Sequence, residues 1–244
     1  INGKRELSGS IKISGSKNAS LPILAATILC DKVKLKNVPL VKDIFTMLEL
    51  LRFIGLSATI QKKNGIIQVI CNKKNIKTLA PYNLVKTMRA GVLVLGPLVA
   101  KYKKAKISLP GGCAIGTRPV NLHLFALKKL GAKIKIKNGY IVAEAKNGLR
   151  GAEIKFPSIS VGATENAILA AFNAKGKTVL KNCAIEPEVK DLIKFLNNLG
   201  GKILIKDRKI SIAGSSKNLK KNITHEIIFD RIELGTYMIA AALV

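Results

Sequence analysis

The sequence predicts an α/β fold in which three copies of a βαβαββ unit make one domain. A pattern of strand, glycine turn, apolar helix, strand, amphipathic helix and hairpin begins at Ile11 and again at Ala152. The tripeptide "LKN" recurs at 35–37 and 180–182, in the second strand of each copy, and Gly55 and Gly200 stand where each second helix ends, a position that favours a left-handed residue. A divergent third copy lies between them, over 82–145.

Each element of the first copy follows from its residue pattern. Short apolar or alternating stretches predict strands at 11–14 and 33–39 and a hairpin over 56–70. Helical spacing of apolar residues predicts helices over 20–30 and 41–55. The second copy repeats this order over its own residues.

The helices at 20–30 and 166–174 are apolar around most of their circumference, which is typical of buried helices. We therefore expect neighbouring units to pack these helices together in a shared core and to turn their sheets outward. A solenoid is the alternative, although units of roughly 70 residues are longer than the usual solenoid period.

The net charge of +28 comes from lysines spread through every segment, with only seven arginines. We interpret the lysines as a solvated surface and expect no nucleic-acid partner, with a basic nucleic-acid-binding protein kept as an alternative class. The longest apolar runs, such as 90–100, are shorter than the roughly 20 residues of a membrane span. We expect no membrane association and a cytoplasmic location.

The cysteines are widely spaced, without a pattern for disulfides or metal ligands. Cys30, Cys71 and Cys183 lie in apolar stretches and are expected to be small buried residues. The segment 225–244 starts like a strand and helix of a fourth unit and stops in an apolar run. We therefore expect the chain to be a fragment of a longer protein.

The turn "SGSKNAS" joins a strand to an apolar helix. Backbone N–H groups at the helix start, together with Lys17, predict an anion site, although a tight connection with a solvated lysine explains the same residues. Asn18 equally suits a helix cap. Arg89 interrupts an apolar helix, so it needs either an internal carboxylate or a ligand.

The stretch "SLPGGCAIGTRPVNLH" surrounds Cys113 with glycines that would let the loop close like a lid. Arg118 precedes Pro119 at the start of a helix, where the helix dipole also attracts anions. This charge favours the Cys113 thiolate and predicts a proton donor or nucleophile. We expect His123 to be a packing or surface residue, because no nearby carboxylate orients it as a base.

Few carboxylates are available for chemistry. Glu165, Glu186 and Glu188 lie near helix starts, where capping alone accounts for them. Asp230 and Glu233 flank Arg231, and an internal ion pair is the simplest account of these three residues.

These motifs, with "LVKTMRA", "SVGATENAILAA", "EPEVKDL" and "DRIELGTY", resemble the UDP-N-acetylglucosamine enolpyruvyl transferases of bacterial cell-wall synthesis, along the whole chain. The resemblance implies an inside-out α/β barrel. It places residues 16–227 in one domain of three βαβαββ units that carries Lys17, Arg89, the Cys113 loop and Arg118. Residues 1–15 and 228–244 would form an incomplete part of a second domain.

The resemblance also implies transfer of the enolpyruvyl group of phosphoenolpyruvate to the sugar 3′-hydroxyl, the first committed step of peptidoglycan synthesis, with no metal or organic cofactor. Cys113 matches the proton donor that fosfomycin alkylates, and it would act with Lys17 and Arg118. Lys17, Asn18 and Arg118 match residues that bind phosphoenolpyruvate. The residues that match the nucleotide-sugar site are Arg89, Arg118, Pro119, Val120, Asn121, Leu122, Ser158, Ile159, Ser160 and Val161.

Two residues depart from the family pattern. Asn121 replaces a frequent aspartate and Ser158 replaces a lysine found in some members. The family's catalytic aspartate and several arginines would lie beyond Val244, so we expect no turnover by this chain alone. A shikimate-type enolpyruvyl transferase is the closest alternative function.

Overall fold

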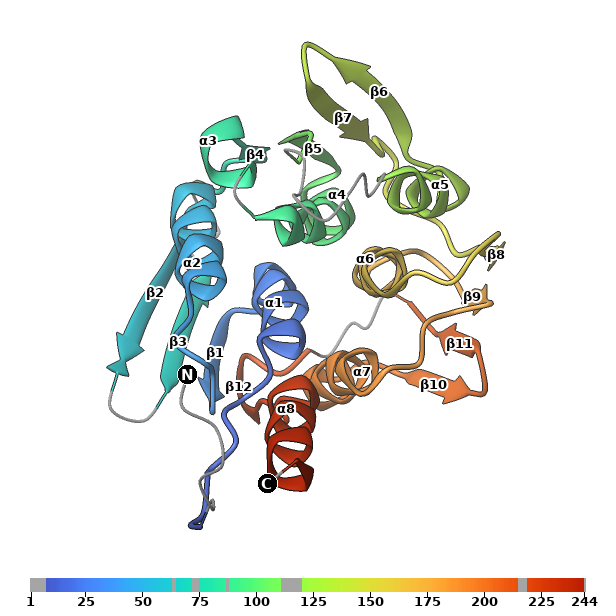
Figure 1. Cartoon of the computed structure of the whole chain (residues 1–244). Helices are drawn as coiled ribbons and strands as arrows, with labels where there is room; N and C mark the ends of the chain where they lie inside the picture. Colours follow the sequence, from blue (N-terminus) through green and yellow to red (C-terminus); the bar gives the residue numbers. More distant parts are fainter. Residues whose placement is uncertain are drawn as a thin grey trace.

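The structure is a computed structural model that describes residues 8–62, 65–71, 75–86, 88–110, 120–214 and 219–243. Within these residues, three four-stranded sheets surround a group of central helices (Figure 1). The helices are inside and the sheets are outside, as the sequence predicts.

The first unit follows the predicted order from its first helix onward. Its elements are α1 (Lys17–Ala26), η1 (Thr27–Leu29), β1 (Lys32–Lys36), α2 (Lys42–Ile54), β2 (Leu56–Gln61) and β3 (Ile66–Cys71). Gly55 caps α2 in the left-handed conformation with φ 116°, which glycine adopts without steric cost.

The middle unit diverges most in its helices. Its elements are β4 (Leu79–Ala80), α3 (Tyr82–Val85), η4 (Arg89–Val94), α4 (Leu95–Tyr102), β5 (Lys104–Ser108), α5 (Asn121–Lys129), β6 (Lys133–Lys137) and β7 (Tyr140–Glu144). The continuous helix predicted around Arg89 is wrong, because Arg89 begins a 3₁₀ segment. Gly91 lies within that segment, and Pro97, which has no N–H to donate, stands in the first turn of α4.

The last unit and the end of the chain contain the remaining elements. These are β8 (Glu153–Lys155), α6 (Val161–Ala171), β9 (Thr178–Lys181), α7 (Pro187–Leu199), β10 (Ile203–Lys206), β11 (Lys209–Ile212), β12 (Asn222–Glu226) and α8 (Arg231–Ala242). Gly200 caps α7 with φ 117°, so the two glycines that the repeat predicts have the same role.

The three sheets share one topology, with strand orders β12-β1-β3-β2, β4-β5-β7-β6 and β10-β11-β9-β8. In each sheet the first two strands of the unit are parallel and the hairpin is antiparallel. The prediction of a first strand at 11–14 is wrong. β12 takes that place beside β1, with Val33 opposite Ile223, because both strands point alternate residues into the core.

The "LKN" asparagines show how closely the first and last units correspond. Asn37 and Asn182 both adopt positive φ, at 55° and 57°. Asn37 donates from Nδ2 to the Ile227 carbonyl at 3.0 Å, and Asn182 donates from Nδ2 to the Phe156 carbonyl at 2.9 Å. Because the two acceptors directly follow β12 and β8, β12 is the counterpart of β8 and not the start of a fourth unit.

A buried side-chain hydrogen bond attaches β12 to the central helices. His225 of β12 and Asp191 of α7 approach within 3.0 Å between Nε2 and Oδ1, and both are almost fully buried. The backbone N–H of Ile228 donates to the other Asp191 oxygen at 3.4 Å. The strand β12 therefore closes the ring of units, which rules out an open solenoid.

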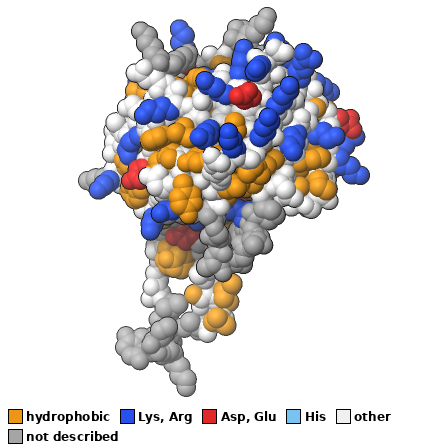
Figure 2. All heavy atoms as spheres, turned by 90° about the horizontal axis from the view of Figure 1, so that it is seen from above, with side chains coloured by type: hydrophobic (Ala, Val, Ile, Leu, Met, Phe, Trp, Pro, Cys, Tyr) orange, Lys and Arg blue, Asp and Glu red, His pale blue; other side chains and the backbone are white. Residues whose placement is uncertain are grey.

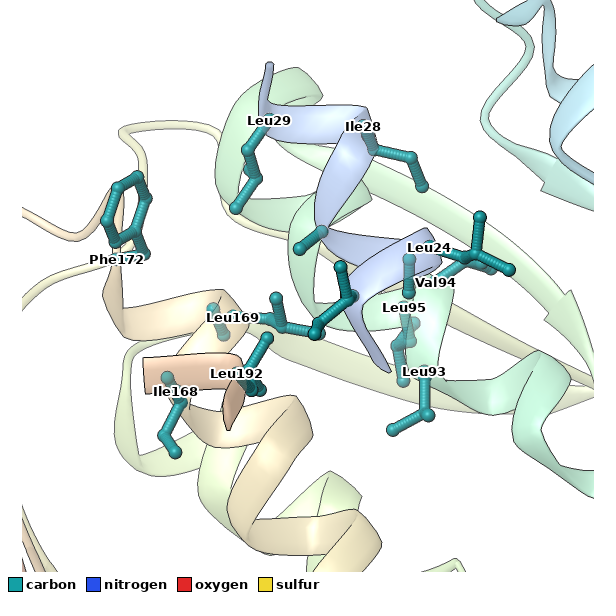
Figure 3. Packing of buried hydrophobic residues seen from close by; sticks show 14 of the residues in the cluster. Leu24, Ile28, Leu29, Leu93, Val94, Leu95, Ile168, Leu169, Phe172 and Leu192 are labelled. Carbon is teal, nitrogen blue, oxygen red and sulfur yellow. The ribbon is translucent and has the colours of Figure 1, made fainter. Parts of the chain in front are cut away.

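The core fills the space between α1, η4, α4, α6 and α7. Figure 3 shows Leu24 of α1 and Ile28 of η1 close to Val94 and Leu95, with Leu169 of α6 between α1 and α7. All of α6 from Ala163 to Ala171 is buried, which confirms the all-round burial predicted for this helix.

The surface carries the lysines. Figure 2 shows Lys and Arg side chains scattered over one face, with polar and apolar groups between them and few acidic ones. Cys30, Cys71 and Cys183 are buried, as predicted. No helix in the described part of the chain is both long and apolar enough to span a membrane.

Candidate functional site

Four helices begin at the edge of one cleft of about 630 Å³. The first turns of α1, α6, α7 and α8 all contribute to its lining. Helix starts offer N–H groups and a partial positive charge to an anion. The residues that line the cleft are Lys17, Asn18, Leu21, Pro22, Asp43, Met88, Arg89, Ala90, Val92, Leu93, His123, Ser160, Val161, Gly162, Glu165, Glu186, Glu188 and Arg231.

Serine side chains cap two of these helices. Ser16 accepts from the N–H of Ala19 at 3.2 Å and Ser160 accepts from that of Ala163 at 3.3 Å. The alternative role of Asn18 as the cap of α1 is therefore wrong, because Ser16 fills that position. Asn18 lies in the first turn and lines the cleft.

Lys17 is held from two sides. Its Nζ forms an ion pair with Asp43 Oδ2 at 3.0 Å, and its backbone N–H donates to Asp230 Oδ2 at 3.4 Å. The ammonium group is partly exposed, with 42% of the side chain accessible, so it remains within reach of a ligand. Asp43 was not predicted as a site residue, because its only signal in the sequence is an acidic residue at the start of α2.

Asn166 joins the elements that form one wall of the cleft. Its Oδ1 accepts from the N–H of Gly96 at 2.8 Å, and its Nδ2 lies 3.1 Å from the Val92 carbonyl and 3.0 Å from His123 Nδ1. Since the Gly96 donor fixes the amide orientation, Nδ2 donates to His123 Nδ1 and the imidazole proton belongs on Nε2. A polar residue within the apolar "NAILAA" was the only sequence signal for this junction.

His123 is a buried packing residue, which confirms the prediction for it. Burial, and to a lesser degree the positive charge of Arg89, lower the pKa of His123 from 6.5 to about 4. The ring is therefore neutral near pH 7. Arg89 and the start of α6 therefore lie beside the uncharged imidazole ring of His123.

Three glutamates form the acidic wall of the cleft. Glu165 belongs to α6, and Glu186 and Glu188 lie at the start of α7. Capping does not explain Glu165, because Ser160 caps α6 and Glu165 is buried inside the helix. Burial, followed by the charges of Glu188 and Glu186, raises the pKa of Glu165 well above its usual value.

Arg231 completes the rim of the cleft. The ion pair predicted among Asp230, Arg231 and Glu233 is wrong, because Arg231 Nε pairs with Glu188 Oε1 at 3.0 Å. Asp230 instead caps α8, and Glu233 accepts from the backbone N–H of Ser14 at 3.1 Å. The chain turns between β12 and α8, which points Arg231 toward α7.

The cleft brings together part of the predicted site. Lys17, Asn18, Arg89, Ser160 and Val161 line it. The other predicted residues with described positions are not among the lining residues of the cleft. They lie next to His123 or Ser160 in the sequence and are Val120, Asn121, Leu122, Ser158 and Ile159. The predictions for Cys113, Arg118 and Pro119 fall outside the described residues.

A family model described as EPSP synthase (3-phosphoshikimate 1-carboxyvinyltransferase) matches residues 1–244. The chain belongs to the EPSP synthase family. This family member is 60% identical over 243 residues to the UDP-N-acetylglucosamine 1-carboxyvinyltransferase of Pelagibacter ubique (strain HTCC1062), with 99% of this chain and 57% of that protein covered.

Other relatives of the chain carry the same name. The chain is 50% identical to the UDP-N-acetylglucosamine 1-carboxyvinyltransferase of Endomicrobium trichonymphae and 49% identical to that of Rickettsia akari (strain Hartford), each match covering 100% of this chain. These matches cover 57% and 58% of the two proteins. The chain thus spans somewhat over half the length of these curated relatives.

Solved structures share the fold. The enolpyruvyl transferase NikO from Streptomyces tendae superposes with a TM-score of 0.83 at 22% identity, covering 98% of this chain and 56% of that one. An EPSP synthase from Acinetobacter baumannii gives a TM-score of 0.69 at 19% identity, covering 89% of this chain and 49% of that one. The predicted α/β fold, with helices inside three outer sheets, is confirmed as that of the enolpyruvyl transferases.

Proposed function

We propose that this chain belongs to an enzyme that transfers the enolpyruvyl group of phosphoenolpyruvate to the 3′-hydroxyl of UDP-N-acetylglucosamine and releases phosphate. The observation that carries the proposal is the 60% identity, over almost the whole chain, to a relative named UDP-N-acetylglucosamine 1-carboxyvinyltransferase. The place of this reaction in peptidoglycan synthesis, and a cytoplasmic location of the enzyme, belong to the same proposal.

The chemistry of the cleft fits two anionic substrates. Phosphoenolpyruvate carries a carboxylate and a phosphate, and the nucleotide sugar carries a diphosphate. Lys17 and Arg89 supply positive charge beside the N-termini of α1 and α6, so the two substrates can be held together despite their mutual repulsion. We assign Lys17, Asn18 and Arg118 to phosphoenolpyruvate.

The nucleotide sugar is assigned to the adjoining surface. Arg89, Ser160 and Val161 face the cleft, where a cation and a helix N-terminus suit the diphosphate. The assignments of Arg118, Pro119, Val120, Asn121, Leu122, Ser158 and Ile159 to the same ligand follow the family resemblance.

The reaction needs a proton on the terminal carbon of the enol. Cys113 is the assigned donor, and protonation makes the neighbouring carbon electrophilic. The sugar 3′-hydroxyl then gives its proton to a base while its oxygen bonds to that carbon, which yields a tetrahedral intermediate. Loss of a proton from the methyl group and departure of phosphate restore the double bond in the product.

Calorimetric titration of the chain with UDP-N-acetylglucosamine tests the substrate assignment. We expect Arg89→Met to weaken binding about tenfold or more, since a charge-assisted contact contributes about 1.5–3 kcal/mol. The matched control is Arg52→Met, because Arg52 lies on the exposed side of α2 and donates to the Ala58 carbonyl at 2.9 Å. Equal losses in the two variants would contradict the assignment of Arg89.

Shikimate 3-phosphate is the competing ligand, because the matching family is described by that substrate. Stronger binding of shikimate 3-phosphate than of the nucleotide sugar would replace the proposal with a shikimate-type transferase. Fosfomycin provides a separate test of Cys113. Cys113→Asp should keep nucleotide-sugar binding and lose fosfomycin labelling, whereas an adduct on another cysteine would contradict the role of Cys113.

A further inference from the structure

The first turn of α6 offers two backbone donors to the cleft. Ser160 Oγ accepts from the Ala163 N–H at 3.3 Å, but the N–H groups of Val161 and Gly162 have no acceptor within the part of the chain that is described. These groups and the positive end of the helix dipole favour an anion. A helix start alone does not select a ligand, whereas a buried side-chain donor beside it does.

His123 provides that side-chain donor. Only 4% of the residue is accessible, and its ring lies against the first turn of α6. A Cβ added to Gly162 would be 3.2 Å from His123 Cε1 and 3.5 Å from Nε2, so no side chain separates this edge of the ring from the helix start. Since His123, Val161 and Gly162 all line the cleft, one diphosphate group can contact all three.

The Asn166 amide decides which ring nitrogen of His123 carries the proton. The Gly96 N–H can only donate and lies 2.8 Å from Oδ1, while the Val92 carbonyl can only accept and lies 3.1 Å from Nδ2. Nδ2 therefore donates to His123 Nδ1 at 3.0 Å, which requires a lone pair on Nδ1 and places the proton on Nε2. Among the described residues this Nε2–H has no acceptor, and a buried donor without one is costly unless a ligand supplies it.

The positive charge near His123 suits an anionic acceptor. Arg89 lines the same cleft, and its charge adds to burial in lowering the pKa of the His123 ring to about 4. The ring is therefore a neutral donor that lies beside a cation. An anion held at the start of α6 would gain from Arg89 and from the helix dipole together.

The acidic residues of the cleft oppose an anion only in part. Two of the four have a cationic partner at 3.0 Å, namely Asp43 with Lys17 and Glu188 with Arg231. Burial, followed by the charges of Glu188 and Glu186, raises the pKa of Glu165 well above its usual value, which favours its uncharged form. Glu186 has no cationic partner in the described ranges, but it belongs to the start of α7 rather than to α6.

We propose that His123 is a specificity-determining donor and that Asn166 is its positioning residue. Asn166 holds the ring in the Nε2–H form, and Nε2–H donates to a diphosphate oxygen of the nucleotide sugar at the N-terminus of α6. This inference rests on the proposed function, because it takes the nucleotide sugar as the ligand, and it adds two residues to the assigned site.

Two substitutions at position 123 separate the donor from the volume of the ring. The side-chain amide of His123→Gln can place an N–H near the position of Nε2, whereas the shorter amide of His123→Asn cannot reach it. Asn166→Leu removes the donor to Nδ1. Asn197→Ala is the matched control, because it removes two hydrogen bonds of 2.9 Å at an exposed position of α7. Calorimetric titration with UDP-N-acetylglucosamine measures binding.

We expect His123→Asn to weaken binding about tenfold, as for loss of one charge-assisted hydrogen bond, and His123→Gln to stay within about threefold of the starting protein. Asn166→Leu should weaken binding about threefold or more, because the ring is no longer held in place. In the His123→Asn background the same change should add less than about twofold, because its effect passes through the ring. Asn197→Ala should bind like the starting protein.

Nitrogen-15 NMR of the imidazole rings tests the positioning role directly. The chain has 2 histidines, so the His123 signals are identified by their loss in His123→Gln. At neutral pH the starting protein should show a neutral ring with its proton on Nε2. The Nε2–H signal should move when UDP-N-acetylglucosamine or inorganic pyrophosphate is added. In Asn166→Leu the ring should show both tautomers.

Three results would overturn the inference. These are equal affinity of His123→Asn and the starting protein for the nucleotide sugar, a proton on Nδ1 in the starting protein, and an undiminished loss from Asn166→Leu in the His123→Asn background. If Asn166→Leu does not fold, the two His123 variants and the ring spectra decide. If the starting protein does not bind the nucleotide sugar, the proposed function fails, and an Nε2–H signal unmoved by pyrophosphate would refute the donor role as well.

Discussion

Replacing Asn166 with leucine tests whether one amide holds the wall of the cleft together. The change removes the acceptor of the Gly96 N–H and the donor to His123 Nδ1. The Val92 carbonyl keeps a second donor, the N–H of Leu95. Two buried groups are thus left without their partner, at about 1–3 kcal/mol each, so we expect the free energy of unfolding to fall by about 2–6 kcal/mol.

Urea unfolding followed by circular dichroism measures this loss. Asn197→Ala is the matched control, because Asn197 also makes two hydrogen bonds of 2.9 Å, both to Ile203, but at an exposed position. The control should lose only about 1 kcal/mol. A loss in Asn166→Leu no larger than in Asn197→Ala would refute the idea that Asn166 is the junction of η4, α4, α5 and α6.

Two further predictions concern buried titratable groups. The free energy of unfolding should fall as the pH drops from 6.5 to about 4, because His123 takes up a proton in the unfolded chain more readily than in the folded protein. The measurement is the slope of the free energy of unfolding against pH, which should be smaller in His123→Gln by up to about 1.4 kcal/mol per pH unit. An unchanged slope would contradict the neutral, buried ring. Asp191→Leu removes the acceptor of His225 and Ile228, and should cost about 2–5 kcal/mol and speed amide exchange in β12 more than in β9. Equal exchange in the two strands would show that this pair does not fasten β12.

The repeated unit could be predicted because its signals are local. Gly55 and Gly200 end equivalent helices, and Asn37 and Asn182 take the same left-handed turn. The first strand was assigned to the wrong residues, because 11–14 and 222–226 both have a pattern that suits a strand. Only pairing across the whole length of the chain selects β12 as the neighbour of β1.

The candidate site was predicted in part. Lys17, Asn18 and Arg89 stood out as polar residues at helix starts or in apolar segments, and the structure brings them to one cleft. Glu165 was mistaken for a cap, since a helix-proximal glutamate looks the same in sequence whether it is exposed or buried. Asp43 was missed because an acidic residue in a first turn is common.

The sequence by itself determined the repeated unit, the order of its elements from the first apolar helix onward, the buried character of the central helices and the family. These depend on the spacing of apolar residues, on glycines and on motifs, which are properties of short segments. The tertiary structure alone decided that β12 closes the ring, that Arg231 pairs with Glu188, and that Asn166 joins α6 to η4, α4 and α5. These contacts join residues more than 40 positions apart, and the free energy of such a pairing depends on burial and geometry that only the packed units create.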